Sequence, residues 1–282
     1  MGVDKNNILQ MKSHVDKKIS DFGSTIYHYT SIKSFISMLK TKQLWLSSTG
    51  SMNDKKEIIS FVEMIEGELR EYKRIDFFRK VYEEIPRKYQ YAMSLSTERD
   101  DAAQWERYGD LARGLCIGFD VKKLEECLWD NKNIMFNRVY YDQNIINNEN
   151  YKVVKNYFET GFCYPYSSED EMIDLLIMSG HFHKHVSFKH ECEIRILAKP
   201  QAIDNYQVKR EIIELGEVLK AVIKLNLDKM GFEKGIDFQK LITEVIIGPR
   251  SQQNLEILKQ YAYTNGYSNI IDHIIESKCP LR

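Results

Sequence analysis

The sequence is poor in proline, has an odd number of cysteines and lacks a long apolar run. Only 5 prolines occur in 282 residues, and neither an internal repeat nor a low-complexity linker marks a seam between independent domains. The 5 cysteines form no C-x-x-C pair, which argues against a disulfide framework and against a thiolate zinc site. No stretch of about 18 apolar residues is present, and no apolar block of signal-peptide length lies near the start. We therefore expect a cytoplasmic protein with no membrane partner.

An excess of one charge is also missing. The 40 Lys and Arg residues nearly cancel the 41 Asp and Glu residues, and the formal net charge is -1. Bulk charge therefore gives no argument for nucleic acid or an anionic membrane as a partner, although a local basic patch stays open.

Familiar catalytic signatures are absent as well. The sequence contains no G-x-x-x-x-G-K-[ST], no H-E-x-x-H and no G-x-S-x-G motif. Its glycines at Gly109, Gly114 and Gly118 have the wrong spacing for a dinucleotide fingerprint. These absences disfavour an ATPase, a zinc protease, a hydrolase with a nucleophile elbow and a Rossmann-type enzyme.

Apolar periodicity, turn residues and capping residues predict an α+β fold. The predicted strands are Ile26–Tyr29, Gln43–Ser48, Tyr91–Ser96, Gly114–Phe119, Cys192–Ala198, Val218–Leu225, Glu244–Ile247 and Asn269–Ile275. The predicted helices begin at Ser31, run through Ile58–Ile65, and cover Ala102–Tyr108, Asn144–Phe158, Glu169–His185 and Gln252–Ala262. Strands and helices do not alternate strictly, which favours α+β over α/β. We expect one domain over residues 1–282, with a core at about 24–120 and 186–282 and a helical insertion at about 121–185.

A histidine cluster is the one pattern typical of a metal site. His181, His183 and His185 alternate, and His190 follows closely. On a strand all three imidazoles would share one face, but on a helix only His181 and His185 would do so. We expect a helix end here, where the helix dipole favours histidine without any metal. A nuclease or another metal enzyme stays an alternative.

Several separated motifs stand above this background. They are Y-H-Y-T-S (27–31), L-W-L-S-S (44–48), M-N-D-x-x-E (52–57), S-L-S-T (94–97), W-x-x-Y-G (105–109), G-L-C-I-G-F-D (114–120), K-x-x-x-F-x-x-E-x-E-x-R (184–195), I-I-G-P-R (246–250) and S-x-x-P-x-R (277–282). In this order they resemble a large bacterial family of domains of unknown function found near abortive-infection and phage-defence genes, akin to the AbiGi group. The resemblance covers nearly the whole chain.

That family in turn resembles a divergent branch of the ADP-ribosyltransferase fold, in which a split β-sheet binds NAD. The resemblance implies that His28 corresponds to the first-strand histidine that bonds the adenosine ribose, and Glu193 to the catalytic glutamate of a late strand. RNA 2'-phosphotransferases and the DNA-modifying DarT toxins have a similar opening of strand, helix and second short strand. The middle residue of the His-Tyr-Glu triad has no tyrosine here, and Ser47 is the candidate.

The chemistry explains why such residue types would be needed. Cleavage of the nicotinamide bond of NAD produces an oxocarbenium-like ribose, which a carboxylate at the 2'-hydroxyl stabilises. Glu193 suits that role, and in an E-x-E on a strand Glu191 would face the same side and orient or deprotonate the acceptor. Arg195 falls on the same face and would neutralise the pair or hold a pyrophosphate.

The remaining cofactor-binding candidates are His28, Tyr29, Thr30, Ser47, Asn53, Trp105, Tyr108 and Arg195. Each has a simpler interpretation too. Asn53 and Asp54 are economically explained as a helix cap, with Glu57 completing a capping box. Trp105 and Tyr108 lie three apart on one helix face and form either core or one wall of an NAD pocket. In the simpler interpretation, Glu191, Glu193 and Arg195 form the solvent face of an amphipathic strand. His28 would then be a buried histidine that is hydrogen-bonded to a backbone carbonyl.

The leading hypothesis is an NAD-dependent ADP-ribosyltransferase that acts as an anti-phage toxin. Its acceptor would be nucleic acid or a protein of the translation machinery, and an antitoxin protein is a possible partner. The alternative is a non-catalytic sensor or binding module that uses the same cleft. Both hypotheses require the strands of His28 and Glu193 to be adjacent, with the two side chains facing one groove.

Overall fold

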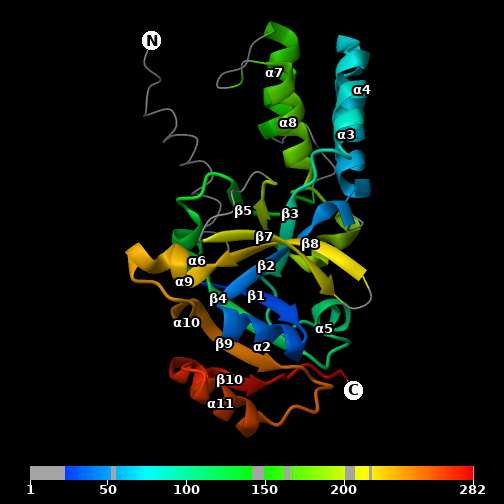
Figure 1. Ribbon diagram of the computed structural model, residues 1–282. Coiled ribbons are helices and arrows are strands. Elements are labelled where there is room, and N and C mark those ends of the chain that lie inside the picture. The colour runs from blue at the N-terminus through cyan, green and yellow to red at the C-terminus, as the bar shows by residue number, and fades with distance from the viewer. Residues whose placement is uncertain are drawn as a thin grey trace.

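The computed structural model describes residues 23–51, 55–141, 149–161, 166, 168–200, 207–215 and 218–281. Helices surround one large mixed sheet of ten strands (Figure 1). The predicted α+β class is therefore confirmed. Among the described residues no helix is both long enough and apolar enough to cross a membrane.

The elements have the following bounds. The strands are β1 (Thr25–Thr30), β2 (Gln43–Ser48), β3 (Tyr91–Ser96), β4 (Leu115–Asp120), β5 (Ile134–Arg138), β6 (Glu193–Ala198), β7 (Val208–Leu215), β8 (Val218–Asn226), β9 (Ile242–Ile247) and β10 (Ile274–Glu276). The α-helices are α2 (Ile32–Thr41), α3 (Lys55–Glu68), α4 (Ile75–Glu84), α5 (Ala102–Tyr108), α6 (Val121–Leu128), α7 (Glu149–Thr160), α8 (Glu169–Gly180), α9 (Leu227–Gly231), α10 (Phe238–Leu241) and α11 (Leu255–Thr264). The 3-10 helices are η2 (Thr49–Ser51), η3 (Arg70–Tyr72), η5 (Val186–Glu191), η6 (Phe232–Lys234) and η7 (Ser268–His273).

The sheet branches at β3. Its main path runs β10-β9-β4-β1-β3-β2-β8-β7, and β6 pairs with β3 and with β5 outside this path. Along one edge β3 meets β1 at Tyr27↔Ser96 and β2 at Ser47↔Ala92. Along the other edge β3 pairs with β6 over its whole length. The prediction that the strands of His28 and Glu193 are adjacent is wrong, because β3 lies between β1 and β6.

Short-range capping explains where the first helices begin. The Ser31 hydroxyl accepts a hydrogen bond from the Ser34 amide and caps α2. Asp101 caps α5 in the same way. Ser168 and Glu171 form a reciprocal capping box at the start of α8. The predicted caps of α3, Asn53 and Asp54, lie outside the described residues.

Two large hydrophobic cores contain most of the buried apolar side chains. The larger one lies on one face of the sheet and includes side chains of α2, α6, α10 and α11. The second core joins α3, α4, α7 and α8, which stand together above the sheet and are called here the helical unit (Figure 1). The helical unit is built from two stretches of chain and not from residues 121–185 alone, since α3 and α4 precede that range. Within that range, α6 and β5 pack with the larger core.

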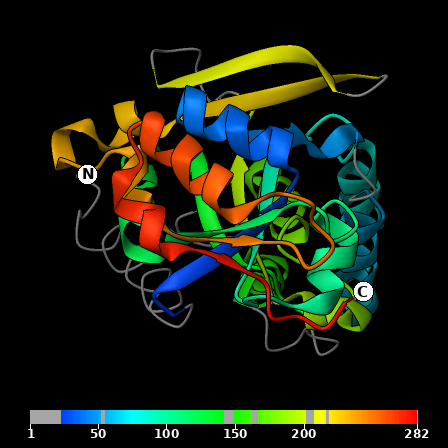
Figure 2. The ribbon, with the colours of Figure 1, turned by 90° about the horizontal axis from the view of Figure 1, so that it is seen from below.

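The β7–β8 hairpin forms one border of the molecule. Its strands are antiparallel over eight residue pairs, from Val208↔Leu225 to Leu215↔Val218. Seen from below, the hairpin runs outside α2 and away from β10 and α11 (Figure 2). β7 is the terminal strand of the sheet path. The sequence pattern predicts β8 but not β7.

Candidate functional site: a buried carboxylate cluster

Strand register decides which predicted site residues share a face. Tyr27 lies opposite Ser96, and Ser96 lies opposite Glu193, so these three side chains point to one side of the sheet. His28 is the next residue after Tyr27 and therefore points to the other side, where Ile26 belongs to the larger core. The prediction that His28 and Glu193 face one groove is wrong.

His28 has the bonding of a structural histidine. Its Nδ1 lies 3.1 Å from the backbone oxygen of Ser94, so the Nδ1–H tautomer donates to that carbonyl. Burial lowers the pKa of His28 to about 4, because the charged imidazolium loses hydration. Thr30 shares the His28 face, two residues further along β1. Both residues are thus separated from Glu193 by the sheet itself.

Glu193 lies at the centre of a network of buried charges. Its carboxylate accepts hydrogen bonds from Arg195 Nε at 2.7 Å, from Lys184 Nζ at 3.1 Å and from Ser94 Oγ at 2.5 Å. The residue is 4% exposed. Burial alone would raise its pKa, but Arg195 and Lys184 outweigh that effect and lower the pKa of Glu193 to about 2. Glu193 is therefore a carboxylate at any physiological pH.

Glu191 reaches the same network from a different element. It ends η5, and Cys192 then adopts a left-handed φ of 44° before β6 begins at Glu193. The prediction that both glutamates lie on one strand is wrong. Nevertheless, Lys184 Nζ lies 2.5 Å from Glu191 Oε2, and this lysine joins the two carboxylates. The turn at Cys192 therefore replaces strand alternation as the cause of their proximity.

A third carboxylate connects this network to the helical unit. Glu57 of α3 accepts a hydrogen bond from Arg195 Nη2 at 3.1 Å and lies 3.9 Å from Lys184 Nζ. Arg195 also donates from Nη1 to the backbone oxygen of His181 at 2.7 Å. The guanidinium is 3% exposed and thus holds α3, β6 and the end of α8 together.

Arg107 and Tyr108 of α5 connect the network to the surface. Arg107 Nη1 and the Tyr108 hydroxyl donate to Glu191 Oε1 at 3.0 and 2.9 Å. Their exposed fractions are 47% and 46%, against 4% for the Glu191 side chain. Burial of the hydroxyl raises the pKa of Tyr108 to about 12, with Glu191 adding to the effect. The phenol therefore stays protonated and acts as a donor.

We name these residues the carboxylate cluster. It comprises Glu57, Arg107, Tyr108, Lys184, Glu191, Glu193 and Arg195. Its three carboxylates are balanced by three cations. Burying such a network is costly, and well-packed apolar residues would often stabilise a fold equally well. Concentrated buried charge that half-exposed side chains connect to the surface is typical of functional sites, and this makes the cluster the candidate site.

Other predicted residues are structural or lie apart from the cluster. Trp105 is fully buried, donates from Nε1 to Asp100 at 2.8 Å, and packs edge-on against Tyr29 with ring centroids 4.9 Å apart. Both aromatic residues belong to a small core, which decides the earlier alternative for Trp105 in favour of core. Ser47 pairs with Ala92 of β3 and Val222 of β8. Asn53 lies outside the described residues.

Several residues of the site were not predicted from the sequence. Lys184 and Arg107 were not proposed as site residues, and Glu57 was considered only as part of a helix cap. Ser94 was missed as well, as was Tyr141, whose hydroxyl accepts a hydrogen bond from the Glu193 amide at 2.8 Å. A signal did exist, because Lys184 opens the motif that contains Glu191, Glu193 and Arg195. Ser94 likewise opens the S-L-S-T motif.

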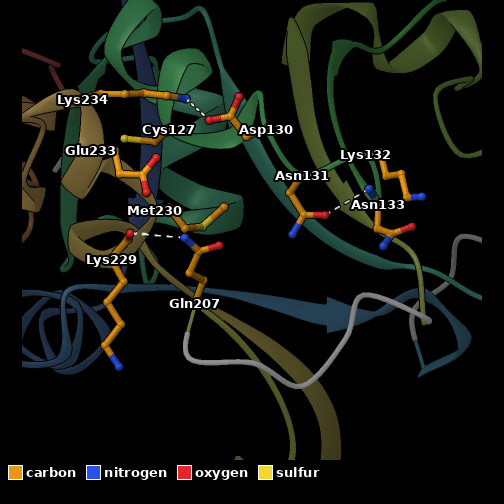
Figure 3. Close-up of a pocket in the computed structure, with 10 residues that line it drawn as sticks. All are labelled: Cys127, Asp130, Asn131, Lys132, Asn133, Gln207, Lys229, Met230, Glu233 and Lys234. Atoms are coloured by element: carbon orange, nitrogen blue, oxygen red, sulfur yellow. Dashed lines mark hydrogen bonds and ion pairs between the residues drawn. The ribbon is translucent and has the colours of Figure 1, made fainter.

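A cavity of about 400 Å³ lies elsewhere, between the end of α6 and the α9–η6 segment (Figure 3). Its lining residues are Cys127, Asp130, Asn131, Lys132, Asn133, Gln207, Lys229, Met230, Glu233 and Lys234. Lys234 and Asp130 form an ion pair of 2.7 Å at its rim. None of the carboxylate cluster contributes to this lining. Within the described part of the chain, no group of three or more His, Cys, Asp or Glu side chains is arranged to hold a metal ion.

Fold and site together define an α+β protein with a buried carboxylate cluster that reaches the surface at α5 through Arg107 and Tyr108. Residues 104–196 match a family described as a protein of unknown function, DUF2971. This stretch contains every member of the carboxylate cluster except Glu57. No curated protein sequence and no solved structure matches the chain.

Proposed function

We propose that the protein is an NAD-dependent ADP-ribosyltransferase in which Glu191 is the catalytic carboxylate. The observation that carries this proposal is the contact of Glu191 with Arg107 and Tyr108, the two most exposed members of the cluster. A carboxylate beside an exposed cation suits a substrate that has both a ribose and a pyrophosphate. His28 has no part in this proposal, because it lies on the opposite face of the sheet.

In the proposed reaction NAD approaches from the side of α5. Arg107 turns from Glu191 to the pyrophosphate, and the Tyr108 hydroxyl turns aside as well. Glu191 Oε1, which both groups contact in the structure, then faces the ribose. The bond between ribose C1' and the nicotinamide nitrogen breaks, and nicotinamide leaves with the electron pair. Glu191 stabilises the positive ribose, the acceptor attacks C1', and Glu191 takes the proton that the acceptor loses. Glu193 acts as a positioning residue, since it holds Lys184 and Arg195 in place.

The order of the sequence motifs supports the same proposal. They resemble a bacterial family associated with phage defence and, more distantly, the ADP-ribosyltransferases. A defensive role follows from that resemblance alone, as do nucleic acid or a translation protein as acceptor and an antitoxin as partner. The carboxylate cluster supports only the chemistry at the ribose.

Purified full-length protein, incubated with adenylate-labelled NAD and cell extract, tests the activity. We expect nicotinamide release and transfer of label, and a loss of about 100-fold or more in Glu191→Gln, because one transition-state contact of this kind contributes two to three powers of ten. Glu256→Gln, at an exposed position of α11, is the matched control and should keep full activity. Wild-type protein that neither releases nicotinamide nor transfers label would refute the proposal, as would an unimpaired Glu191→Gln variant.

A non-catalytic binding module is the second candidate, and one observation favours it. Every carboxylate oxygen of Glu191 and Glu193 already accepts a hydrogen bond from a cation or a hydroxyl. Such a saturated network holds its shape and recognises a ligand without reacting. Calorimetric binding of NAD without nicotinamide release, combined with full anti-phage protection by Glu191→Gln, would select this function over catalysis.

A further inference from the structure

The open edge of β7 is the strongest unexplained feature. Among the described residues β7 pairs only with β8. The Asn226 amide donates to the Gln207 carbonyl at 2.9 Å, which fixes the hydrogen-bonding pattern of the hairpin. Odd-numbered residues of β7 therefore direct their backbone groups toward β8. Arg210, Ile212 and Glu214 direct theirs toward the open edge, because the direction alternates along an antiparallel strand.

Apolar side chains lie exposed beside this edge. Ile212 of β7 is 74% exposed and Leu219 of β8 is 75% exposed. Ile212 and Leu219 lie on the same face of the hairpin as Val208 and Leu225. Val208 and Leu225 are fully buried in the larger core. The hairpin thus extends the apolar face of the sheet beyond the body of the protein. Exposed apolar residues on the terminal strand of a sheet are typical of a strand that receives another strand.

We propose that two copies of this chain associate through their β7 strands, paired antiparallel about a two-fold axis at Ile212. In that register the Ile212 residues of the two copies face each other, and Arg210 faces Glu214 of the second copy. Symmetry repeats the ion pair on the other side of the axis. Each of these pairs exchanges two backbone hydrogen bonds, since all three residues point their backbone groups to the open edge.

The charges select this register over its neighbours. A shift by two residues in one direction places Arg210 opposite Ile212, and a shift in the other direction places Ile212 opposite Glu214. Either shift loses both ion pairs. On the opposite face of the strand, Glu211 already pairs with Lys209 and with Lys224 and would face the apolar Ile213 of the second copy. No like charges face each other in the chosen register.

Charge reversal on the full-length chain tests the interface. Sedimentation velocity at about 1–100 µM should show a wild-type dimer. Arg210→Glu and Glu214→Arg should each weaken the dimer by about tenfold or more, because each change turns two attractive pairs into repulsive ones. An equimolar mixture of the two variants should dimerise again, since the introduced glutamate of one copy would then face the introduced arginine of the other. The double variant should also recover.

The controls separate pairing from folding. Lys220→Glu alters the same hairpin on β8, away from the open edge, and should leave the dimer unchanged. Circular dichroism checks that Arg210→Glu folds, because Arg210 also interacts with Tyr91. A wild-type chain that is monomeric at every concentration would overturn the proposal. So would a dimer insensitive to both reversals, or one that mixing the two variants fails to restore.

Discussion

The buried histidine at the end of α8 should make the protein lose stability on mild acidification. His181 is 1% exposed, and neither ring nitrogen has a hydrogen-bond partner of normal geometry among the described residues, although the Lys88 backbone lies near enough to favour the charged form slightly. Burial, with Arg195 adding to it, lowers the pKa of His181 from 6.5 to about 4. The unfolded chain therefore binds the proton more readily than the folded chain does.

The sign and size follow from this difference. Stability contributed by the neutral imidazole is present above pH 6.5 and is lost as the pH falls toward 4. A pH of 5 is about 1.5 units below the pKa of the histidine in the unfolded chain. Protonation of the unfolded chain therefore lowers the free energy of unfolding by about 2 kcal/mol. His28, whose pKa burial also lowers to about 4, titrates in the same window. A difference between variants is needed to isolate His181.

Urea unfolding at pH 7 and pH 5, followed by circular dichroism, measures that difference. Between pH 7 and pH 5 the free energy of unfolding should fall by about 2 kcal/mol more in the wild-type protein than in His181→Leu, because a leucine side chain cannot bind a proton. His190→Asn removes an exposed histidine nearby and should behave as wild type. Equal losses in wild type and His181→Leu would refute the argument.

Two further predictions concern stability. Arg195→Leu should destabilise the protein by about 3–5 kcal/mol in urea unfolding, because Glu193 and Glu57 would lose a buried cation; a cost below about 1 kcal/mol would contradict this. Gly114→Ala should destabilise by about 1–3 kcal/mol, since its Cβ would lie 2.0 Å from the Thr30 carbonyl. Gly67→Ala in α3, where nothing lies within 4 Å, should instead stabilise by about 0.5–1 kcal/mol and is the control.

Elements with strong local signals were predicted to the residue. The strands Gln43–Ser48 and Tyr91–Ser96 and the helix Ala102–Tyr108 coincide with β2, β3 and α5. In β2 buried and partly exposed side chains alternate, and α5 has Asp101 as its cap. Such signals depend only on neighbours in the sequence, which explains their success.

Elements that depend on distant partners were predicted poorly. β7 is a strand because β8 pairs with it, and its own sequence, V-K-R-E-I-I-E-L, is half charged. The predicted strand Asn269–Ile275 is mostly wrong: residues Ser268–His273 form η7, and only Ile274–Glu276 pair with β9. Ile270 packs into the core from the 3-10 helix. The run of isoleucines was therefore interpreted as a strand although most of it is helical.

The site shows the same division between local and distant information. Glu193 and Arg195 share a face because side chains alternate along a strand, and this needed only the sequence. The position of His28 needed the register of β1 against β3, and a shift by one residue would move every side chain of β1 to the other face. No pattern within β1 fixes that register. The sequence therefore predicts the face of Glu193 and Arg195 relative to each other, but it does not predict on which face of the sheet His28 lies.

The position of Arg195 connects the site to the architecture. It binds Glu193 on the sheet and Glu57 on the helical unit, and it is almost completely buried between them. Movement of α3 away from β6 would expose the guanidinium but leave Glu57 without a partner of this strength, at a cost of several kcal/mol. The helical unit is thus held in one position over the carboxylate cluster. The proposed function then requires NAD to approach Glu191 past Arg107 and Tyr108 of α5, the two most exposed members of the cluster.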